Sequence, residues 1–425
     1  MSLSISPSSE GCSIPVFMPH PKIESPFHFA RPCALILLVT PLVVLGSGTR
    51  IGFKDADATG RGNAFAATAD NPSAIYYNPA GLTQIDGEAV SFTAYDIRLQ
   101  SDYKSATGSA KMKEQSNLVP QVYCAWSPHD KPYAFGLGVY APFGLSTEWA
   151  PNSPLSTLAT KAEQKTSDVA GVMAYEIAPG LSIGGGPVFH HAETNLRRNV
   201  SPVNEYSFDG SGNALGFNTG IRWQPVEKHA FGISYQHHYT VDLKGTTGIS
   251  GTPFANQPAS ANFEFPEVII AGYSYRPAPG WNIEVNIDWT NWDRLNNFDV
   301  QSSAPLAVSQ PLNWQSSYFY EFGVTRTFAN GFSLSAGYTY AENSVPDSTY
   351  NAAIPDANRS IFALGVGYHK GRISTHLSYQ YSYSPDRTVA GSPASFPGSF
   401  PAGQTSDGTY RNRFNAIAAS IDYTF

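Results

Sequence analysis

The sequence predicts an all-β protein: a transmembrane antiparallel β-barrel of about 14 strands, with its lumen plugged by a small amino-terminal hatch. Apolar and polar residues alternate over stretches of about 9–13 residues, longer than most soluble strands and close to what a tilted strand needs to cross a bilayer. Charged residues make up only 14% of the chain and aromatic residues 13%. Tight turns also alternate with long polar stretches, as in outer-membrane barrels.

Residues 1–48 are predicted to be a signal peptide or leader. A cation precedes an apolar run from Ala34 to Leu45, and small residues follow it. A run of about a dozen apolar residues is too short to span a bilayer but fits the hydrophobic region of a signal peptide. Pro41 argues against the alternative, a buried core helix. We place the cleavage site loosely near Gly48.

Residues 49–88 do not have the pattern of a strand. They are rich in Ala and Gly and hold two Asn-Pro pairs, Asn71-Pro72 and Asn78-Pro79. Proline fixes φ and removes a donor, while an Asn side chain can bond neighbouring backbone groups. Because about 14 strands enclose a lumen wide enough to need filling, this segment is expected to fold into it as a hatch. A plain surface loop is the alternative.

Residues 89–425 are predicted to form the barrel. From Trp281 to Trp289, apolar residues share one face of a strand and amide or acidic residues share the other, with an aromatic residue at each end. Aromatic residues at the strand ends suit the aromatic girdles of a membrane barrel. Because backbone N–H and C=O groups cannot remain unpaired in lipid, the sheet must close into a barrel. The predicted strands are 89–101, 115–127, 133–141, 167–177, 181–197, 214–223, 230–243, 263–275, 281–291, 315–328, 332–343, 359–369, 372–385 and 413–425.

The third predicted strand, 133–141, and the residues just after it contain several groups that interrupt a strand. These are Gly136, Gly138, Pro142 and Gly144. Proline cannot donate to the ladder, and glycine often marks a bulge or a close approach of backbone. The pattern predicts a kink here, although the glycines could instead only ease a bend of the barrel.

The long stretch 142–166 carries unusually many apolar residues for a loop. They are Phe143, Leu145, Trp149, Leu155 and Leu158. An exposed loop with this much apolar surface indicates contact with a ligand or with lipid. Packing against neighbouring loops is the alternative.

The chain ends on an aromatic residue, Phe425, on the apolar face of the last predicted strand. Many outer-membrane barrels end in this way, and the barrel-assembly machinery reads that end. We therefore expect outer-membrane lipids and this machinery as partners, and a bacterial outer-membrane location.

Composition and motifs exclude several other classes. A net charge of −7 without a basic patch gives no case for nucleic acid as a partner. Two histidine pairs are present, His190-His191 and His237-His238. The two members of each pair would point to opposite faces of a strand, so they cannot jointly bind one metal ion. No paired C-x-x-C spacing and no G-x-S-x-G motif is present. We expect no cofactor, no metal site and no enzymatic function.

Other charged residues are expected to face the lumen. Glu284, Asp288 and Glu321 lie on predicted inner faces and are expected to tune contacts with the hatch rather than to catalyse a reaction. A carboxylate ligand would need a cationic partner. The candidates, between which the sequence does not choose, are Arg197, Arg198, Arg326 and Arg413.

The stretch GRGNAFAATADNPSAIYYNPAGLTQIDG, residues 60–87, closely resembles the amino-terminal hatch of the FadL family of outer-membrane transporters of long-chain fatty acids and hydrocarbons. The family's Asn-Pro-Ala hallmark is matched by Asn78, Pro79 and Ala80, and the resemblance extends over residues 52–425. The long leader without a tidy cleavage site is the departure from the family pattern. Further segments that resemble the family are VYAPFGLSTEW (139–149) and WTNWDRL (289–295).

The resemblance implies passive transport of a hydrophobic ligand, above all a long-chain fatty acid. The ligand would be captured among the long loops, enter an apolar pocket, and leave sideways through a gap at the kinked third strand after the hatch shifts. An aromatic or aliphatic hydrocarbon channel is the alternative. A general diffusion porin is a weaker one, because an open pore needs no plug before its first strand.

Overall fold

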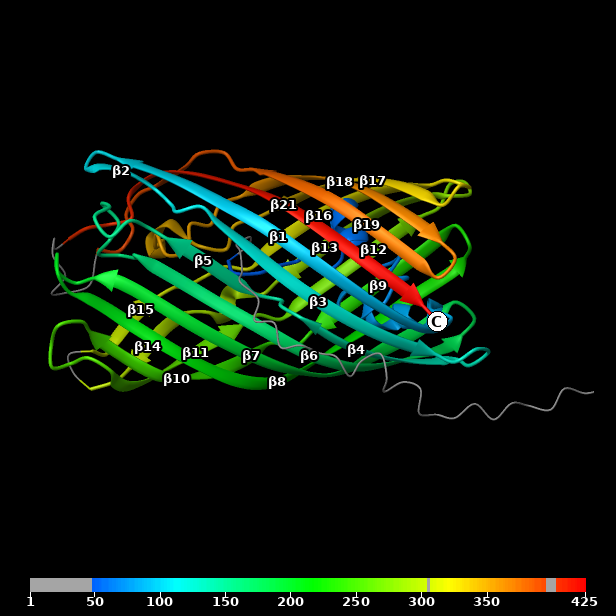
Figure 1. The fold of residues 1–425 in the computed structure, drawn as a ribbon, viewed down its shortest axis with the longest axis horizontal. Helices are drawn as coiled ribbons and strands as arrows, with labels where there is room; N and C mark the ends of the chain where they lie inside the picture. The colour runs from blue at the N-terminus through cyan, green and yellow to red at the C-terminus, as the bar shows by residue number, and fades with distance from the viewer. Residues whose placement is uncertain (1–47, 304–305, 395–402) are drawn as a thin grey trace, which may run out of the picture. The chain divides into compact units, whose positions relative to one another are not determined.

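The computed structural model describes residues 48–303, 306–394 and 403–425 (Figure 1). The predicted leader, residues 1–48, lies outside the described residues except for Gly48. Within the described part of the chain, no helix is long and apolar enough to cross a membrane.

The wall is a closed ring of antiparallel strands. Its first strand, β1 (Gly87–Ser105), pairs with its last, β21 (Gly408–Thr424), from Ala89 opposite Thr424 to Lys104 opposite Thr409. Fourteen strands, each hydrogen-bonded to the next, complete the circuit, which confirms the predicted fold class. In order around the ring they are β1, β3 (Gln115–Ser127), β4 (Tyr133–Tyr140), β6 (Lys161–Ala178), β7 (Leu181–Asn199), β8 (Glu205–Val226), β9 (His229–Gln236), β12 (Val268–Tyr275), β13 (Trp281–Thr290), β16 (Ser317–Thr327), β17 (Phe332–Ala341), β18 (Arg359–Lys370), β19 (Ile373–Tyr383) and β21.

Seven further strands within the described residues extend the wall at the end that carries the long connections, opposite the carboxy terminus (Figure 1). They are β2 (Gly108–Lys111), β5 (Gly144–Glu148), β10 (Tyr239–Ile249), β11 (Gln257–Phe265), β14 (Asn297–Gln301), β15 (Val308–Pro311) and β20 (Arg387–Val389).

Several stretches expected to be long polar loops are therefore strands. β8 begins at Glu205, well before the predicted residue 214, because Tyr206 and Phe208 continue the inward apolar alternation. β10 and β11 likewise occupy most of residues 244–262, which lie between the predicted strands 230–243 and 263–275.

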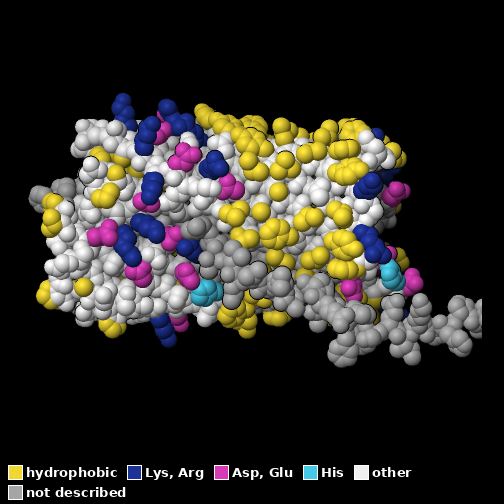
Figure 2. Space-filling model, in the orientation of Figure 1, with side chains coloured by type: hydrophobic (Ala, Val, Ile, Leu, Met, Phe, Trp, Pro, Cys, Tyr) yellow, Lys and Arg dark blue, Asp and Glu magenta, His cyan; other side chains and the backbone are white. Residues whose placement is uncertain are grey.

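The two faces of the wall are inverted relative to a soluble protein. Leu334, Leu364 and Ile417 point outward and are exposed, whereas Asn286 and Asp288 point inward and are buried. Figure 2 shows apolar side chains covering the half of the visible face nearer the short turns, and charged side chains gathering toward the other end. This arrangement is that of a barrel with a lipid-facing belt.

Residues 48–86, here called the amino-terminal segment, lie inside the ring (Figure 1). The segment contains α1 (Ala56–Gly60), α2 (Ala74–Tyr77) and the 3₁₀ helix η2 (Pro79–Gln84). All the side chains from Ala64 to Ala69 are buried, so the segment is not the surface loop that was the alternative. Its close approach to the wall requires glycine: a Cβ at Gly184 of β7 would lie 2.6 Å from the carbonyl carbon of Pro79.

Candidate functional site

An apolar pocket opens at the end of the barrel that carries the long connections. It has two lobes, and we call it the mouth pocket after the residues that both lobes share: Leu196, Phe298, Gln310, Asn351 and Ala353. One lobe reaches Thr49 of the amino-terminal segment. Apolar side chains make up most of the lining, which suits a hydrophobic ligand.

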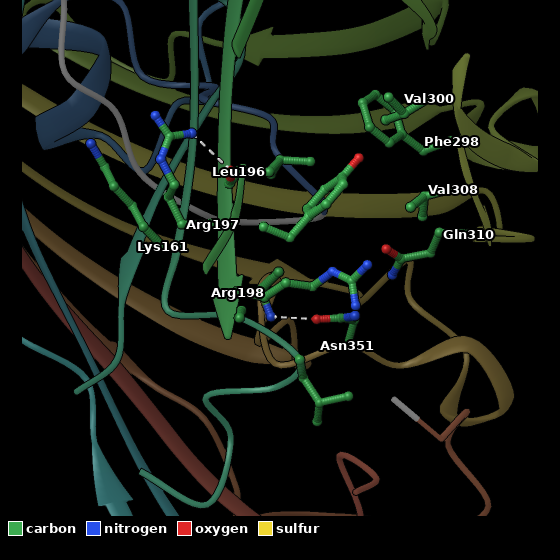
Figure 3. Close-up of a pocket in the computed structure, with 13 residues that line it drawn as sticks. Lys161, Leu196, Arg197, Arg198, Phe298, Val300, Val308, Gln310 and Asn351 are labelled. Carbon is green, nitrogen blue, oxygen red and sulfur yellow. Dashed lines mark hydrogen bonds between the residues drawn. The ribbon is translucent and has the colours of Figure 1, made fainter. Parts of the chain in front are cut away.

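The other lobe carries the positive charge (Figure 3). Arg198 of β7 is an inward-facing, buried residue, and its guanidinium lies over the ring of Tyr206 at 4.7 Å. Arg197 is on the opposite face of the strand and is bonded to both carboxylate oxygens of Asp209 at 2.8 Å. Figure 3 shows Arg197 beside Lys161, and Arg198 on the side of Gln310 and Asn351.

Of the four arginines considered from the sequence, Arg197 and Arg198 line the mouth pocket. Arg326 lies over the Trp281 ring, and Arg413 bonds to Gln100, so neither lines the pocket. Arg198 is the member of the set whose side chain is directed into the lumen beside the apolar lining.

The third wall strand is interrupted at Pro142 and Gly144. β4 ends at Tyr140, after which the chain turns toward the amino-terminal segment. The Ile51 N–H donates to the Pro142 carbonyl at 2.8 Å, and the Gly144 N–H donates to the Thr49 carbonyl at 2.5 Å. β5 then returns to the wall and pairs with β6. Two of the four predicted kink residues therefore lie at a real break.

The interruption leaves a gap in the ladder beside β3. β3 pairs with β4 only from Val122 to Trp126, although it pairs with β1 along its whole length. Residues 115–121 of β3 therefore have no strand partner on that side within the described residues. On the side of the gap toward the long connections, Lys113 joins the two parts of the wall. Its N–H donates to the Glu148 carbonyl at 2.8 Å, and its ammonium group lies 2.9 Å from the Glu148 carboxylate.

Gly136 and Gly138 do not form the kink, so the prediction is wrong for these two. Both lie in the regular part of β4, paired with β3 and with β6. A Cβ at Gly136 would lie 2.7 Å from the Ile75 side chain, and one at Gly138 would lie 3.0 Å from it. These glycines instead make room for α2 to pack against the wall.

The sequence led us to expect that the apolar residues after β4 would be exposed on the surface of a loop. The structure does not show this. Phe143, Trp149, Leu155 and Leu158 are buried, because the connection folds inward against its neighbours. The Trp149 Nε1–H, for example, donates to the Ala352 carbonyl at 2.9 Å. Leu158 lines the mouth pocket.

Leu145, the remaining member of this set, lies in β5. A role of these five residues in ligand capture stays a prediction.

Asn78 of the Asn-Pro-Ala motif fixes the amino-terminal segment to the wall. Its Nδ2 donates to the carbonyls of Ala66 at 2.9 Å and of Ile221 in β8 at 3.0 Å. Its Oδ1 accepts from the Ala80 N–H at 3.3 Å and so caps η2, which Pro79 begins.

The three inward acids do contact the segment. Asp288 pairs with Arg50 at 2.6 Å, with both side chains buried. Glu321 accepts from the Asn63 amide at 2.7 Å, and Glu284 accepts from the Ala67 N–H at 2.8 Å. Nothing in the sequence had marked Arg50 as the partner of Asp288.

Lys54 is a second basic residue that sequence reasoning missed. Its ammonium group donates to the carbonyls of Ile51 and Ala141, the latter at 2.7 Å, and so holds the chain just before the kink. Burial, and next the nearby charge of Arg50, lower the pKa of Lys54 well below its usual value. Because no local pattern announces a lysine buried by residues far along the chain, sequence alone offered no signal for it.

Comparison with known proteins identifies the family. Residues 47–425 match the family model described as "Outer membrane protein transport protein (OMPP1/FadL/TodX)". A putative outer membrane protein of Neisseria meningitidis is 24% identical over 393 residues, which make up 77% of this chain and 84% of the relative. The long-chain fatty acid transport protein of Salmonella typhi is 19% identical over 401 residues, 82% of this chain and 91% of the relative.

The fold has been solved before. The crystal structure of a Pseudomonas aeruginosa FadL homologue superposes with a TM-score of 0.81 at 18% identity, covering 89% of this chain and all of that one (100%). The match to a family of outer-membrane transport proteins confirms the expected outer-membrane location and the expectation that the chain is not an enzyme. The chain belongs to the OMPP1/FadL/TodX family of outer-membrane transport proteins, whose members carry hydrophobic substrates.

Proposed function

We propose that the protein passively carries long-chain fatty acids across the outer membrane. The observation that carries this choice is the mouth pocket, where the buried guanidinium of Arg198 adjoins a long apolar lining. A fatty acid combines an apolar chain with one carboxylate, and guanidinium groups bind carboxylates well. One relative is named for the same cargo.

The path we propose leads from the mouth pocket to the gap beside β3. Thr49 lines the pocket, and its carbonyl also accepts from Gly144 at the kink. Movement of the amino-terminal segment, acting as a hatch, would therefore change the pocket and the kink together. The ligand would then leave sideways between β3 and β5, where the ladder is interrupted.

A hydrocarbon channel is the second candidate. It is favoured by the lobe of the mouth pocket that reaches Thr49, which is lined mainly by apolar residues such as Phe263 and Leu312. A neutral ligand would have no use for the Arg198 charge. An open porin is disfavoured, because residues 48–86 fill the lumen.

The test is uptake of radiolabelled oleate and of toluene by cells that lack their own transporter, with and without this protein. Faster oleate entry supports the proposal. Faster toluene entry alone would replace it with a hydrocarbon channel on the same fold. If neither enters faster while the protein is in the outer membrane, both candidates are wrong.

A further inference from the structure

We propose that the outer face of the barrel carries a binding site for a sugar unit of a glycolipid in the outer leaflet of the membrane. The site is a cavity of about 240 Å³ between β11 and β14, here called the outer cavity. Its lining includes Asn262 and Glu264 of β11, Asn297, Asp299 and Gln301 of β14, and Arg294 of the 3₁₀ helix η3 (Trp292–Arg294). The proposal does not depend on the cargo that the protein carries.

The outer cavity lies where two neighbouring strands separate. β11 pairs with β14 at Ser260 and Ala261, and within the described part of the chain their ladder goes no further. Phe263 of β11 and Phe298 of β14 face inward and line the mouth pocket. Because side chains alternate along a strand, the residues on either side of these two point outward, and they line the outer cavity. The two cavities therefore lie on opposite faces of the same strands.

The lining of the outer cavity can form many hydrogen bonds but has little net charge. Amide groups supply donors and acceptors and carboxylates supply acceptors, which suits sugar hydroxyl groups, since these both donate and accept. Glu264 and Asp299 bring negative charge, and the guanidinium of Arg294 is already paired with Glu267 at 3.1 Å. This balance disfavours a phosphate as the recognised group. Nor do any three His, Cys, Asp or Glu side chains of the described residues gather closely enough to hold a metal ion.

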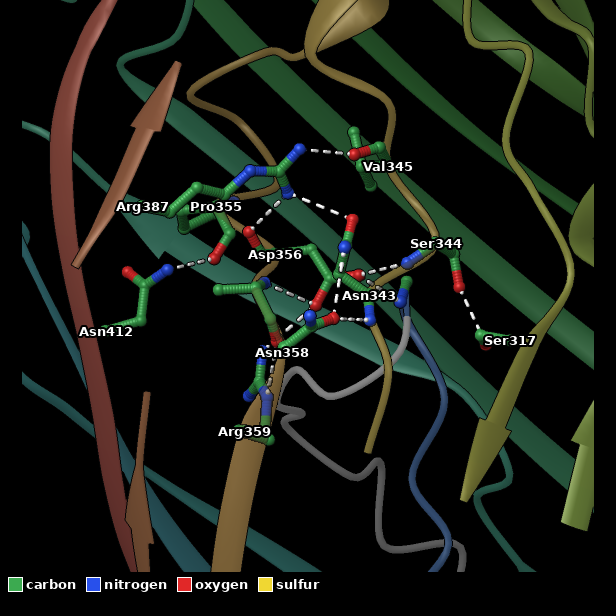
Figure 4. A network of polar contacts seen from close by, with 12 residues as sticks. Ser317, Asn343, Ser344, Val345, Pro355, Asp356, Asn358, Arg359, Arg387 and Asn412 are labelled. Atoms are coloured by element: carbon green, nitrogen blue, oxygen red, sulfur yellow. Dashed lines mark hydrogen bonds and ion pairs between the residues drawn. The ribbon is translucent and has the colours of Figure 1, made fainter. Parts of the chain in front are cut away.

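The amides of the outer cavity differ from an amide pair at the same end of the barrel. In the connection between β17 and β18, the Asn358 Oδ1 accepts from the Asn343 N–H at 2.8 Å and from the Asn343 side chain at 3.1 Å (Figure 4). By contrast, no described residue forms a hydrogen bond with the side chain of Asn262, Asn297 or Gln301. Their donors and acceptors are therefore available to a ligand.

A row of lipid-facing residues lies close to the outer cavity. Tyr235, Ile269, Trp289 and Tyr318 are opposite one another across β9, β12, β13 and β16, as in the aromatic girdle of a membrane barrel. Glu264 precedes Ile269 by five residues, which is roughly 16 Å of extended chain, or about 12 Å along the membrane normal at a tilt near 40°. A phospholipid head-group layer is only about 5–8 Å thick, so a longer head group is needed to reach the cavity.

The position of the outer cavity identifies the class of lipid. Outer-membrane barrels turn their long connections to the outside of the cell, and β11 and β14 lie at that end. Lipids with saccharide head groups make up much of the outer leaflet of bacterial outer membranes. One such molecule can place its acyl chains on the girdle and a sugar unit in the outer cavity. The occupant is thus a membrane lipid and not a soluble sugar.

The experiment is native mass spectrometry of the purified full chain in detergent, titrated with diglucosyl diacylglycerol, with phosphatidylglycerol and with free maltose. The first probe has two sugars and no phosphate, and the second has a phosphate and no sugar. Wild type should bind the diglucosyl lipid at least tenfold more tightly than either of the other probes. Asn262→Ala combined with Asn297→Ala should weaken binding of the diglucosyl lipid about tenfold, as for loss of roughly two hydrogen bonds, and leave binding of phosphatidylglycerol unchanged.

Asn343→Ala combined with Asn358→Ala is the matched control, because it removes two amides at the same end of the barrel that do not line the outer cavity. The control should bind the diglucosyl lipid as wild type does. An equal loss in the control, or no loss in the cavity variant, overturns the proposal. So does tighter binding of phosphatidylglycerol, which would make phosphate the recognised group, or equally tight binding of maltose, which would make a soluble sugar the ligand. If the double cavity variant does not assemble, Asn262→Ala compared with Asn358→Ala makes the same test.

Discussion

Asn78 shows how one side chain can fasten a segment inside a barrel. Its amide bonds the segment through Ala66 and Ala80 and bonds the wall through Ile221. A Cβ on Gly220, the wall residue beside it, would lie 2.2 Å from the Asn78 Oδ1, so the contact needs both residues. Buried polar atoms that lose such partners remain unsatisfied, and each costs about 1–3 kcal/mol.

Replacing Asn78 with Ala should impair oleate uptake while the barrel still assembles, because the change loosens the amino-terminal segment and leaves every wall ladder intact. Uptake by whole cells and heat-dependent migration of the folded barrel on gels measure the two effects. Asn71→Ala is the control, since Asn71 bonds only within the segment, to Ser73 and Asp55. Normal uptake by Asn78→Ala would show that this fastening plays no part in transport.

Arg198 is the residue that should distinguish cargoes. Arg198→Met should reduce oleate uptake roughly tenfold, the loss of about one charged contact, and leave uptake of neutral toluene unchanged. Arg413→Met is the matched control, because Arg413 bonds to Gln100 and lines neither lobe of the mouth pocket. An equal loss for both variants would mean that the guanidinium in the pocket does not select the ligand.

At the scale of elements, the residue pattern of a stretch predicts its secondary structure where that structure depends on the stretch itself. Two-residue alternation identified all fourteen wall strands, because each strand must present one face to lipid and the other to the lumen. The beginning of β8 was missed, since residues 209–213 are rich in Gly and Ser and read as a loop. They are strand because β7 pairs with that stretch throughout and β10 with part of it, which no local pattern reveals.

The candidate site was less predictable for the same reason. Gly136 and Pro142 both looked able to interrupt a strand, yet only the chain near Pro142 leaves the wall. The difference lies in the partner: Ile75 packs against Gly136, whereas Ile51 bonds the carbonyl of Pro142. Pairs so distant in sequence, like Arg50 with Asp288, follow from the whole fold and not from spacing.

The kink itself can be tested by restoring strand character. The double change Pro142→Val with Gly144→Val should favour continued pairing with β3, close the gap and reduce oleate uptake several-fold, because β-branched residues suit a regular ladder. Gly171→Val in β6 is a control with open space around the new side chain. Undiminished uptake in a correctly assembled double variant would place the exit elsewhere.

The molecule as a whole consists of a closed barrel wall and a separate amino-terminal segment that lies inside it. The ring closes through β1 and β21 without help from the amino-terminal segment, so the pairing of its fourteen strands with one another is independent of that segment. The segment in turn covers inward polar groups such as Glu284, Asp288 and Arg222. Once the segment is removed, water can hydrate these groups, because a lumen of about 14 strands is wide enough to admit it.

Deleting residues 50–84 should therefore turn the protein into an ion-conducting pore that still assembles. Single-channel recording in planar bilayers should show a large steady conductance for the deletion variant and none for the full chain. Cells that make the variant should also become sensitive to large antibiotics that the outer membrane normally excludes. If the full chain conducts as well as the variant, the segment does not seal the lumen, and a diffusion porin becomes the better description. If neither conducts, the long connections and not residues 50–84 close the barrel.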